Sequence, residues 1–429
     1  MRSLNTAASG IRSHSDALTV TGDNIANVNT VGFKRSRANF SDVLGRSIAG
    51  STAIPQAGAG SRISTIQQMW AQGALMTTDS PTDLALNGNG FFVVKGNAGG
   101  VDGQFYTRAG QFVIDNGGYL TTTDGMKLQG YAADGTGTLS GSISDLQVDA
   151  GTLPATPTTS AEIFANLDSN EPVLPAATPF DPADPSGTSN YSTSVTAYDS
   201  LGNAHDVTVY FRNNGGGDWE WHAMVDGAEV GGTAGVPTEG ANGTLNFTTN
   251  GALNTETTAA STWDFTGATA GQTIDFDFGE SIGEGGTGLS GSTQHATASS
   301  VTSISQDGFG AGEISGLSIA QNGTITGVFS NGQRRTLGAV AVADFASADG
   351  LDRAGQGLWI ATQESGEALI GQAGAGGRGA VVSGALEGSN VDLAKEFVDL
   401  IAFQRGFSAN SRIVTTADEM YSELVNMKR

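Results

Sequence analysis

Both ends of the chain carry an apolar residue at every seventh position. The N-terminal repeat consists of Leu4, Ile11, Leu18 and Ile25. The C-terminal repeat consists of Leu393, Leu400, Phe407, Val414 and Tyr421, with Leu424 beside it. Such a repeat is typical of a coiled-coil seam, although an amphipathic surface helix would explain each repeat alone. Because two repeats stand at opposite ends of one chain, we predict that residues 1–30 and 386–429 pair as an inner helical coiled-coil domain.

The two predicted helices are not uniformly apolar along their seams. His14 and Asn410 lie in or near the repeats, and Gly406 lies inside the second helix, where glycine costs about 1 kcal/mol relative to alanine. The second helix is expected to begin at a cap formed by Ser389 or Asn390, because their side chains accept hydrogen bonds from the first turn.

Between the helices the pattern changes to short runs of alternating apolar and polar residues. These runs are separated by Asn-Gly and Asp-Gly pairs, as in "GQFVIDNGGYLTTTDGMKLQGY" (110–131), and such pairs are typical of tight hairpin turns. The fold class is therefore predicted to be mainly β with paired N- and C-terminal α-helices. Trp219 and Trp221 alternate with Glu220, which places both indoles on one face of a strand, where core packing is the favoured interpretation.

Changes in composition divide this β region. Seven of the ten prolines lie between Pro154 and Pro185, which indicates a boundary. We predict a discontinuous middle β domain from 81–150 and 300–380, and an outer β domain inserted at 165–299. Residues 31–80 are predicted to form a linker segment with extended or hairpin structure.

The charge of the chain excludes several classes of function. The net charge is -23 at pH 7, and only 15% of residues are charged. This acidity argues against nucleic acid and anionic lipid as partners, since both require a basic surface. The sequence has no cysteine and no apolar run long enough to predict a membrane span. No signal peptide is recognisable in residues 1–30.

No group of residues predicts catalysis, a cofactor or a metal. The four histidines lack ligand spacing; they are His14, His205, His222 and His295. The segment "GQAGAGGRG" (371–379) lacks the Lys-Ser/Thr pair of a phosphate loop and is interpreted as a flexible connector. A pair of aspartates at 275 and 277 offers too few oxygens for Ca²⁺. We predict that the protein is not an enzyme.

Four sequence blocks resemble the rod and hook proteins of the bacterial flagellum. They are "NIANVNTVGFK" (24–34), "QGALMTTDSPTDLALNGNGFFVV" (72–94), "YTRAGQFVIDNGGYLTTTDGMKLQGY" (106–131) and the C-terminal block from residue 384 to the end. Within that family the large insertion and "AYDSLGNAHDVTVYF" (197–211) are similar to hook subunits. A departure occurs at 404–407, where "QRGF" replaces the typical Q-R-A-Y.

The resemblance implies a structural subunit that polymerises with its own copies into a flexible, curved tube. Such a tube acts as a universal joint, transmitting torque from motor and rod to filament. The implied partners are the distal rod, the hook cap, the hook–filament junction proteins and the flagellar export apparatus. The implied location is the extracellular hook, reached by export without a cleavable signal peptide. Alternatives are a distal-rod-like subunit, a secreted β-rich adhesin that binds glycan and, more remotely, a β-rich hydrolase.

The residues expected to carry assembly lie in the two repeats and in the segment that follows the first helix. In this segment Asn27, Gly32 and Phe33 are suited to ending the helix and anchoring the chain. We predict an inter-subunit hinge here, with the basic cluster Lys34, Arg35 and Arg37 against an acidic surface.

Overall fold

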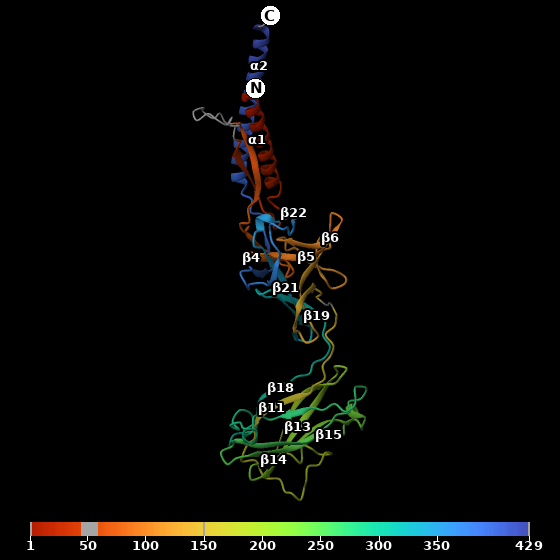
Figure 1. Ribbon diagram of the computed structural model, residues 1–429. Helices are drawn as coiled ribbons and strands as arrows, with labels where there is room; N and C mark the ends of the chain where they lie inside the picture. Colours follow the sequence, from red (N-terminus) through yellow and green to blue (C-terminus); the bar gives the residue numbers. More distant parts are fainter. Residues whose placement is uncertain (1, 44–58, 149–150, 428–429) are drawn as a thin grey trace. The chain divides into compact units, whose positions relative to one another are not determined.

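The computed structural model describes residues 2–43, 59–148 and 151–427 (Figure 1). The described chain divides into two compact units. Unit 1 contains 1–150, 316–328 and 334–429, and unit 2 contains 151–315 and 329–333. The predicted fold class is confirmed, because the terminal helices contact each other and β-sheets make up most of the remaining structure. The finer four-part division of the sequence stays a prediction.

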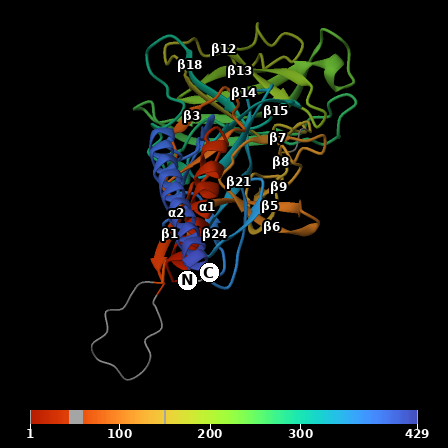
Figure 2. The same ribbon diagram turned by 90° about the horizontal axis from the view of Figure 1, so that it is seen from above.

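The helices of unit 1 lie side by side and run antiparallel (Figures 1 and 2). Helix α1 (Arg2–Ala26) has 25 residues and α2 (Leu393–Met427) has 35. At 1.5 Å per residue, α1 is about 37 Å long and α2 about 52 Å. Figure 1 shows the C-terminal end of α2 extending past the start of α1.

The predicted cap of α2 was wrong. Asp392, rather than Ser389 or Asn390, accepts hydrogen bonds from the N–H groups of Ala394 and Lys395, at 3.0 and 3.3 Å. The side chain of Asn390 is occupied elsewhere, because its Oδ1 accepts from the N–H of Arg35 at 2.7 Å.

Strands next to the helices bring the two ends of the chain together. Strand β1 (Ser36–Asp42) follows α1, pairs antiparallel with β2 (Ser61–Gln68), and both strands contact α1. Strand β3 (Leu75–Thr77) pairs with β26 (Ala385–Glu387), and β4 (Leu84–Asn87) pairs with β25 (Ala380–Ser383). The segments at 72–90 and 380–390 therefore lie together although they are far apart in sequence.

The rest of unit 1 is one branched antiparallel sheet. Its main path runs β19-β20-β21-β9-β5-β6-β23-β22, with β10 and β8 on β9, β7 on β8, and β24 on β21. The bounds are β5 (Phe91–Ala98), β6 (Val101–Thr107), β7 (Phe112–Ile114), β8 (Leu120–Thr122), β9 (Lys127–Ala133), β10 (Leu139–Asp145), β19 (Ile314–Ile319), β20 (Thr324–Phe329), β21 (Arg334–Asp344), β22 (Asp352–Gly355), β23 (Leu358–Ile360) and β24 (Leu369–Gln372). The turn chemistry agrees with the sequence: Gly323, after Asn322, joins β19 to β20 with φ +82.

Unit 2 holds two sheets that share one core. The first has the order β12-β13-β14-β15-β16, and the second the order β17-β11-β18. The bounds are β11 (Ser160–Asn166), β12 (Tyr191–Tyr198), β13 (Ala204–Gly215), β14 (Asp218–Asp226), β15 (Pro237–Phe247), β16 (Leu253–Ser261), β17 (Asp275–Asp277) and β18 (Ser300–Gln306). Trp219 and Trp221 are fully buried in the shared core, as their alternation on one strand predicted.

A half-buried carboxyl makes unit 2 sensitive to pH. The pKa of Glu256, in β16, is raised to about 7, mainly by burial and to a smaller extent by the nearby charges of Asp277 and Glu284. The N–H of Phe278 opposes this increase, because it donates to Oε2 of Glu256 at 3.1 Å. The folded state therefore favours the protonated carboxyl.

We expect Glu256→Gln to reduce the pH dependence of unit 2 stability. A raised pKa contributes stability that is complete below the ordinary value of 4.5 and is lost as the pH rises through about 7. Because Glu256 is partly exposed, we expect a loss of about 1–2 kcal/mol in the unmodified chain and less in the variant. Thermal unfolding of both chains between about pH 5 and pH 8 measures this difference. Equal pH dependence would contradict the prediction.

Candidate assembly site

Small and polar side chains form the closest contact of α1 with the rest of unit 1. The buried positions of this helix are Ala7, Gly10, Ser13, Ala17, Thr21 and Asn24. The predicted repeat lies beside this line, and its members are half-buried: Leu4, Ile11, Leu18 and Ile25. Apolar side chains of α1 therefore remain partly open after the chain has folded.

The repeat of α2 is distributed between the seam and the exterior. Leu400, Phe407 and Val414 are half-buried, whereas Leu393 and Tyr421 are exposed. Leu424 lies in the α2 backbone, but its side chain is outside the described residues. Their role in assembly stays a prediction.

An exposed apolar patch lies on α2 near its start, and the heptad pattern did not identify it. It consists of Phe397, Val398 and Ile401, which are spaced as neighbours on one helix face. The Val398 side chain is 65% exposed. Contiguous apolar side chains on a helix surface typically mark a protein–protein contact.

A buried ionic junction lies in unit 1 where the segment after α1 meets β26. Nζ of Lys34 lies 2.6 Å from Oε1 of Glu387, and Nη1 of Arg108 lies 3.1 Å from Oε2. The side chains of Lys34 and Glu387 are only 1% and 0% exposed. Burial lowers the pKa of Lys34 and of Arg108, and the charge of Glu387 opposes both decreases. Glu387 also accepts from the N–H of Gly73 at 2.9 Å, so its carboxylate joins three segments.

A second polar cluster ties the end of α1 to the start of α2. The side chain of Asn24 donates to Oε2 of Glu396 at 3.0 Å. It also donates to the carbonyl of Ser36 and accepts from the N–H of Ser36, both at 2.8 Å. Arg35 lies 3.3 Å from Oε1 of Glu396. These pairs correct the prediction that the basic cluster meets an acidic neighbour, because Lys34 and Arg35 bind carboxylates of their own chain.

The segment after α1 is fixed within unit 1 at its glycine and aromatic positions. Gly32 and Phe33 are buried, and the N–H of Gly32 donates to the carbonyl of Glu387 at 2.7 Å. Asn27 is half-buried and donates to the carbonyl of Asp23 at 2.9 Å. The bond from Gly32 therefore places this glycine, with Phe33 next to it, beside Glu387 of the ionic junction, whereas Asn27 bonds within the end of α1. An inter-subunit hinge stays a prediction.

We expect Gly32→Ala to destabilise unit 1 by about 2–3 kcal/mol, combining left-handed strain with overpacking. Gly32 has φ +70, and a Cβ there would lie 2.5 Å from the N of Ala109. Gly125→Ala is the control, since Gly125 also has positive φ but nothing within 4 Å. Urea unfolding of both variants measures the difference, and equal losses would show that the contact with Ala109 is unimportant.

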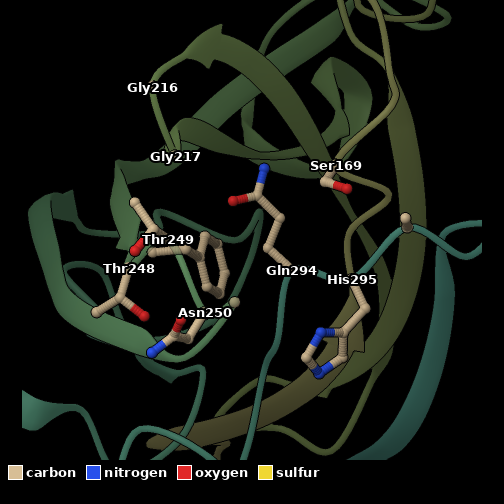
Figure 3. Close-up of a pocket in the computed structure, with 11 residues that line it drawn as sticks. Ser169, Gly216, Gly217, Thr248, Thr249, Asn250, Gln294 and His295 are labelled. Carbon is tan, nitrogen blue, oxygen red and sulfur yellow. The ribbon is translucent and has the colours of Figure 1, made fainter.

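Other polar groups give no reaction site among the described residues. His205 and His222 lie on neighbouring strands, each beside a glutamate at 2.6 Å, and the described residues contain no cluster suited to a metal. Unit 2 has an open cavity of about 430 Å³ (Figure 3). Its lining includes Thr248, Asn250 and His295 but no carboxylate, so it lacks the acid pair of a glycosidase. None of the described helices combines the length and apolarity that crossing a bilayer requires.

The paired terminal helices and the exposed apolar patch on α2 are typical of a protein that associates with other chains. Comparisons with known proteins give the particular family. Family models match at 4–34 (flagella basal body rod protein), 85–162 (flagellar hook protein FlgE/F/G D1 domain), 166–309 (flagellar basal body protein FlaE D2 domain) and 382–427 (flagellar basal body rod FlgEFG protein C-terminal).

Relatives that align over their full length are flagellar hook proteins. The chain is 36% identical to the flagellar hook protein FlgE of Borreliella burgdorferi, over 100% of both chains. It is also 36% identical to FlgE of Salmonella typhimurium, over 99% of this chain and 100% of the relative. A similar fold, with TM-score 0.50 and 17% identity, occurs in the crystal structure of Helicobacter pylori flagellar hook protein FlgE2, covering 71% of this chain and 98% of that chain.

The chain belongs to the flagellar hook protein FlgE family. It is a non-enzymatic structural subunit of the flagellar hook, in the extracellular part of the flagellum, and it serves motility. A hook protein of this kind polymerises with its own copies within the flagellum.

Proposed function

We propose that copies of this chain form a curved, flexible tube that transmits torque from the motor and rod to the filament as a universal joint. The observation that carries this proposal is the apolar patch of Phe397, Val398 and Ile401, which stays exposed although α2 is already paired with α1. A head-to-tail contact made by such a patch repeats without closing and yields a helical polymer. Because only 15% of the residues are charged, few ion pairs can form between subunits. The tube is therefore not held at a single curvature.

The proposed subunit contacts include the partly open apolar positions of both helices and the segment after α1. They are Leu4, Ile11, Leu18, Ile25, Asn27, Gly32, Phe33, Leu393, Leu400, Phe407, Val414, Tyr421 and Leu424. Support for the helical positions other than Leu424 comes from their exposure, since burying a half-exposed leucine or isoleucine against a neighbour removes apolar surface from water.

The distal rod, the hook cap, the hook–filament junction proteins and the export apparatus are the proposed further partners. The resemblance of the terminal blocks to rod and hook subunits supports them. A distal-rod-like role is disfavoured because full-length relatives are hook proteins and a D2 model matches 166–309.

Electron microscopy of the purified polymer tests this function. Curved tubes with both chain termini at the inner wall are expected. Straight tubes would favour the rod-like alternative, and a chain that stays monomeric under all polymerising conditions would overturn the proposal.

A further inference from the structure

Each of the two paired helices has a glycine, and a polar side chain of the other helix fills the space where a Cβ of that glycine would lie. At Gly10 of α1, a Cβ would lie 2.7 Å from Oδ1 of Asn410. At Gly406 of α2, a Cβ would lie 2.6 Å from both Nε2 and Cε1 of His14. Real Cβ atoms essentially never approach other atoms this closely. Each glycine is therefore a hole that fits one side chain of the facing helix.

The two side chains that fill these holes are held in place. The imidazole of His14 lies between aromatic rings on two elements, 5.5 Å from Phe40 of β1 and 6.2 Å from Phe403 of α2. Its Nδ1 is buried without a hydrogen-bond partner among the described residues, so packing positions this ring. Asn410 donates from Nδ2 to the carbonyl of Gly406 at 2.8 Å, which links the two holes. Neither side chain can leave its position without losing these contacts.

The apolar repeats alone do not fix how far one helix slides along the other. Because both repeats have a period of seven, a slip of seven residues, about 10 Å, again places apolar opposite apolar. The two glycines make the native register differ from the registers shifted by seven residues. A slip in one direction places His14 opposite Ile413 and Asn410 opposite Ala17; a slip in the other places His14 opposite Asp399. None of these positions offers a hole.

We propose that Gly10, His14, Gly406 and Asn410 form a register lock, which makes α1 and α2 pair in a single antiparallel register. The lock determines specificity of alignment, since it selects one register between two helices whose apolar repeats allow several. It rests on the proposed function of the paired helices and identifies the residues that fix their alignment.

Gly406→Ala tests the lock, because helix propensity alone predicts the opposite result. Alanine stabilises a helix interior relative to glycine, whereas the lock makes it collide with His14. The chain has no cysteine, so introduced pairs report register without background. Ala7→Cys with Val414→Cys reports the native register, and Ala7→Cys with Tyr421→Cys reports a slip of seven. In purified hooks and monomer, Gly406→Ala should lower the native disulfide yield roughly tenfold relative to the slipped pair.

A matched control and a rescue complete the test. Gly22→Ala, also inside a helix but with nothing within 4 Å of its Cβ position, should keep the native disulfide yield. His14→Ala combined with Gly406→Ala should restore it, and so should Asn410→Ala in a Gly10→Ala chain. An unchanged yield in Gly406→Ala, or no recovery in both double variants, would overturn the lock. Tube formation by the unmodified chain is scored separately, so failure of the proposed function is distinguishable.

Discussion

Glu387→Ala is expected to lower the free energy of unfolding of unit 1 by about 3–5 kcal/mol. Removing this carboxylate leaves Lys34 and Arg108 buried without an opposite charge, and the N–H of Gly73 loses its acceptor. Burial already lowers the pKa of both cations, and the attraction of Glu387 is the main interaction that opposes this decrease. Without it, the structure must admit water or release a proton from Lys34, and either result loosens the joined segments.

The measurement is hydrogen exchange of unit 1 peptides during a urea titration, because local protection separates this unit from unit 2. Asp145→Asn is the matched control, since it removes the carboxylate of an exposed pair, 3.1 Å from Lys127, in the same unit. Exposed pairs contribute about 1 kcal/mol or less. Equal losses in the two variants would show that the junction stabilises no more than a surface ion pair.

The sequence predicted those features that depend on local patterns. The seven-residue repeats predicted helices at both ends, and the alternation of Trp219 and Trp221 predicted that both side chains share one buried face. In each case the period of the side chains matches the period of the backbone, so neighbours in sequence share one environment.

The ionic junction could not be predicted, because its members are not neighbours in sequence. Lys34 and Glu387 are 353 residues apart and meet through the pairing of β3 with β26. The sequence therefore placed the basic cluster on a surface. The sequence did contain one signal, because cations are scarce in this acidic chain and "GFKR" stands next to a helix end. A lysine buried at such a place costs free energy unless a carboxylate pairs with it.

The seam illustrates a different limit. The repeat predicted which helices pair but not which residues touch most closely, because small residues such as Ala7 and Ala17 lie beside the larger apolar ones. Gly406 signals only a cost in helix propensity when read alone. Its role becomes visible once His14 is found against it.

Val398→Asp is expected to abolish hook polymerisation while leaving both units folded. Val398 is 65% exposed, so an aspartate there meets water in the monomer and changes its stability by about 0.5 kcal/mol or less. In a polymer the same carboxylate would be buried against an apolar neighbour at every subunit contact, which costs several kcal/mol each time. Since one contact repeats along the whole tube, a loss of this size raises the concentration required for assembly about a thousandfold or more.

Val236→Asp is the matched control, because this valine of unit 2 is also exposed, at 46%, and receives the same new charge. Electron microscopy and sedimentation of the two variants should give tubes for Val236→Asp and monomers for Val398→Asp, with equal thermal unfolding of the units. Tubes of normal length from Val398→Asp would remove the α2 patch from the subunit contact and leave the half-buried repeat as the surface that carries assembly. Loss of tubes in both variants would instead attribute the effect to added negative charge on an already acidic chain, since like charges repel wherever copies meet.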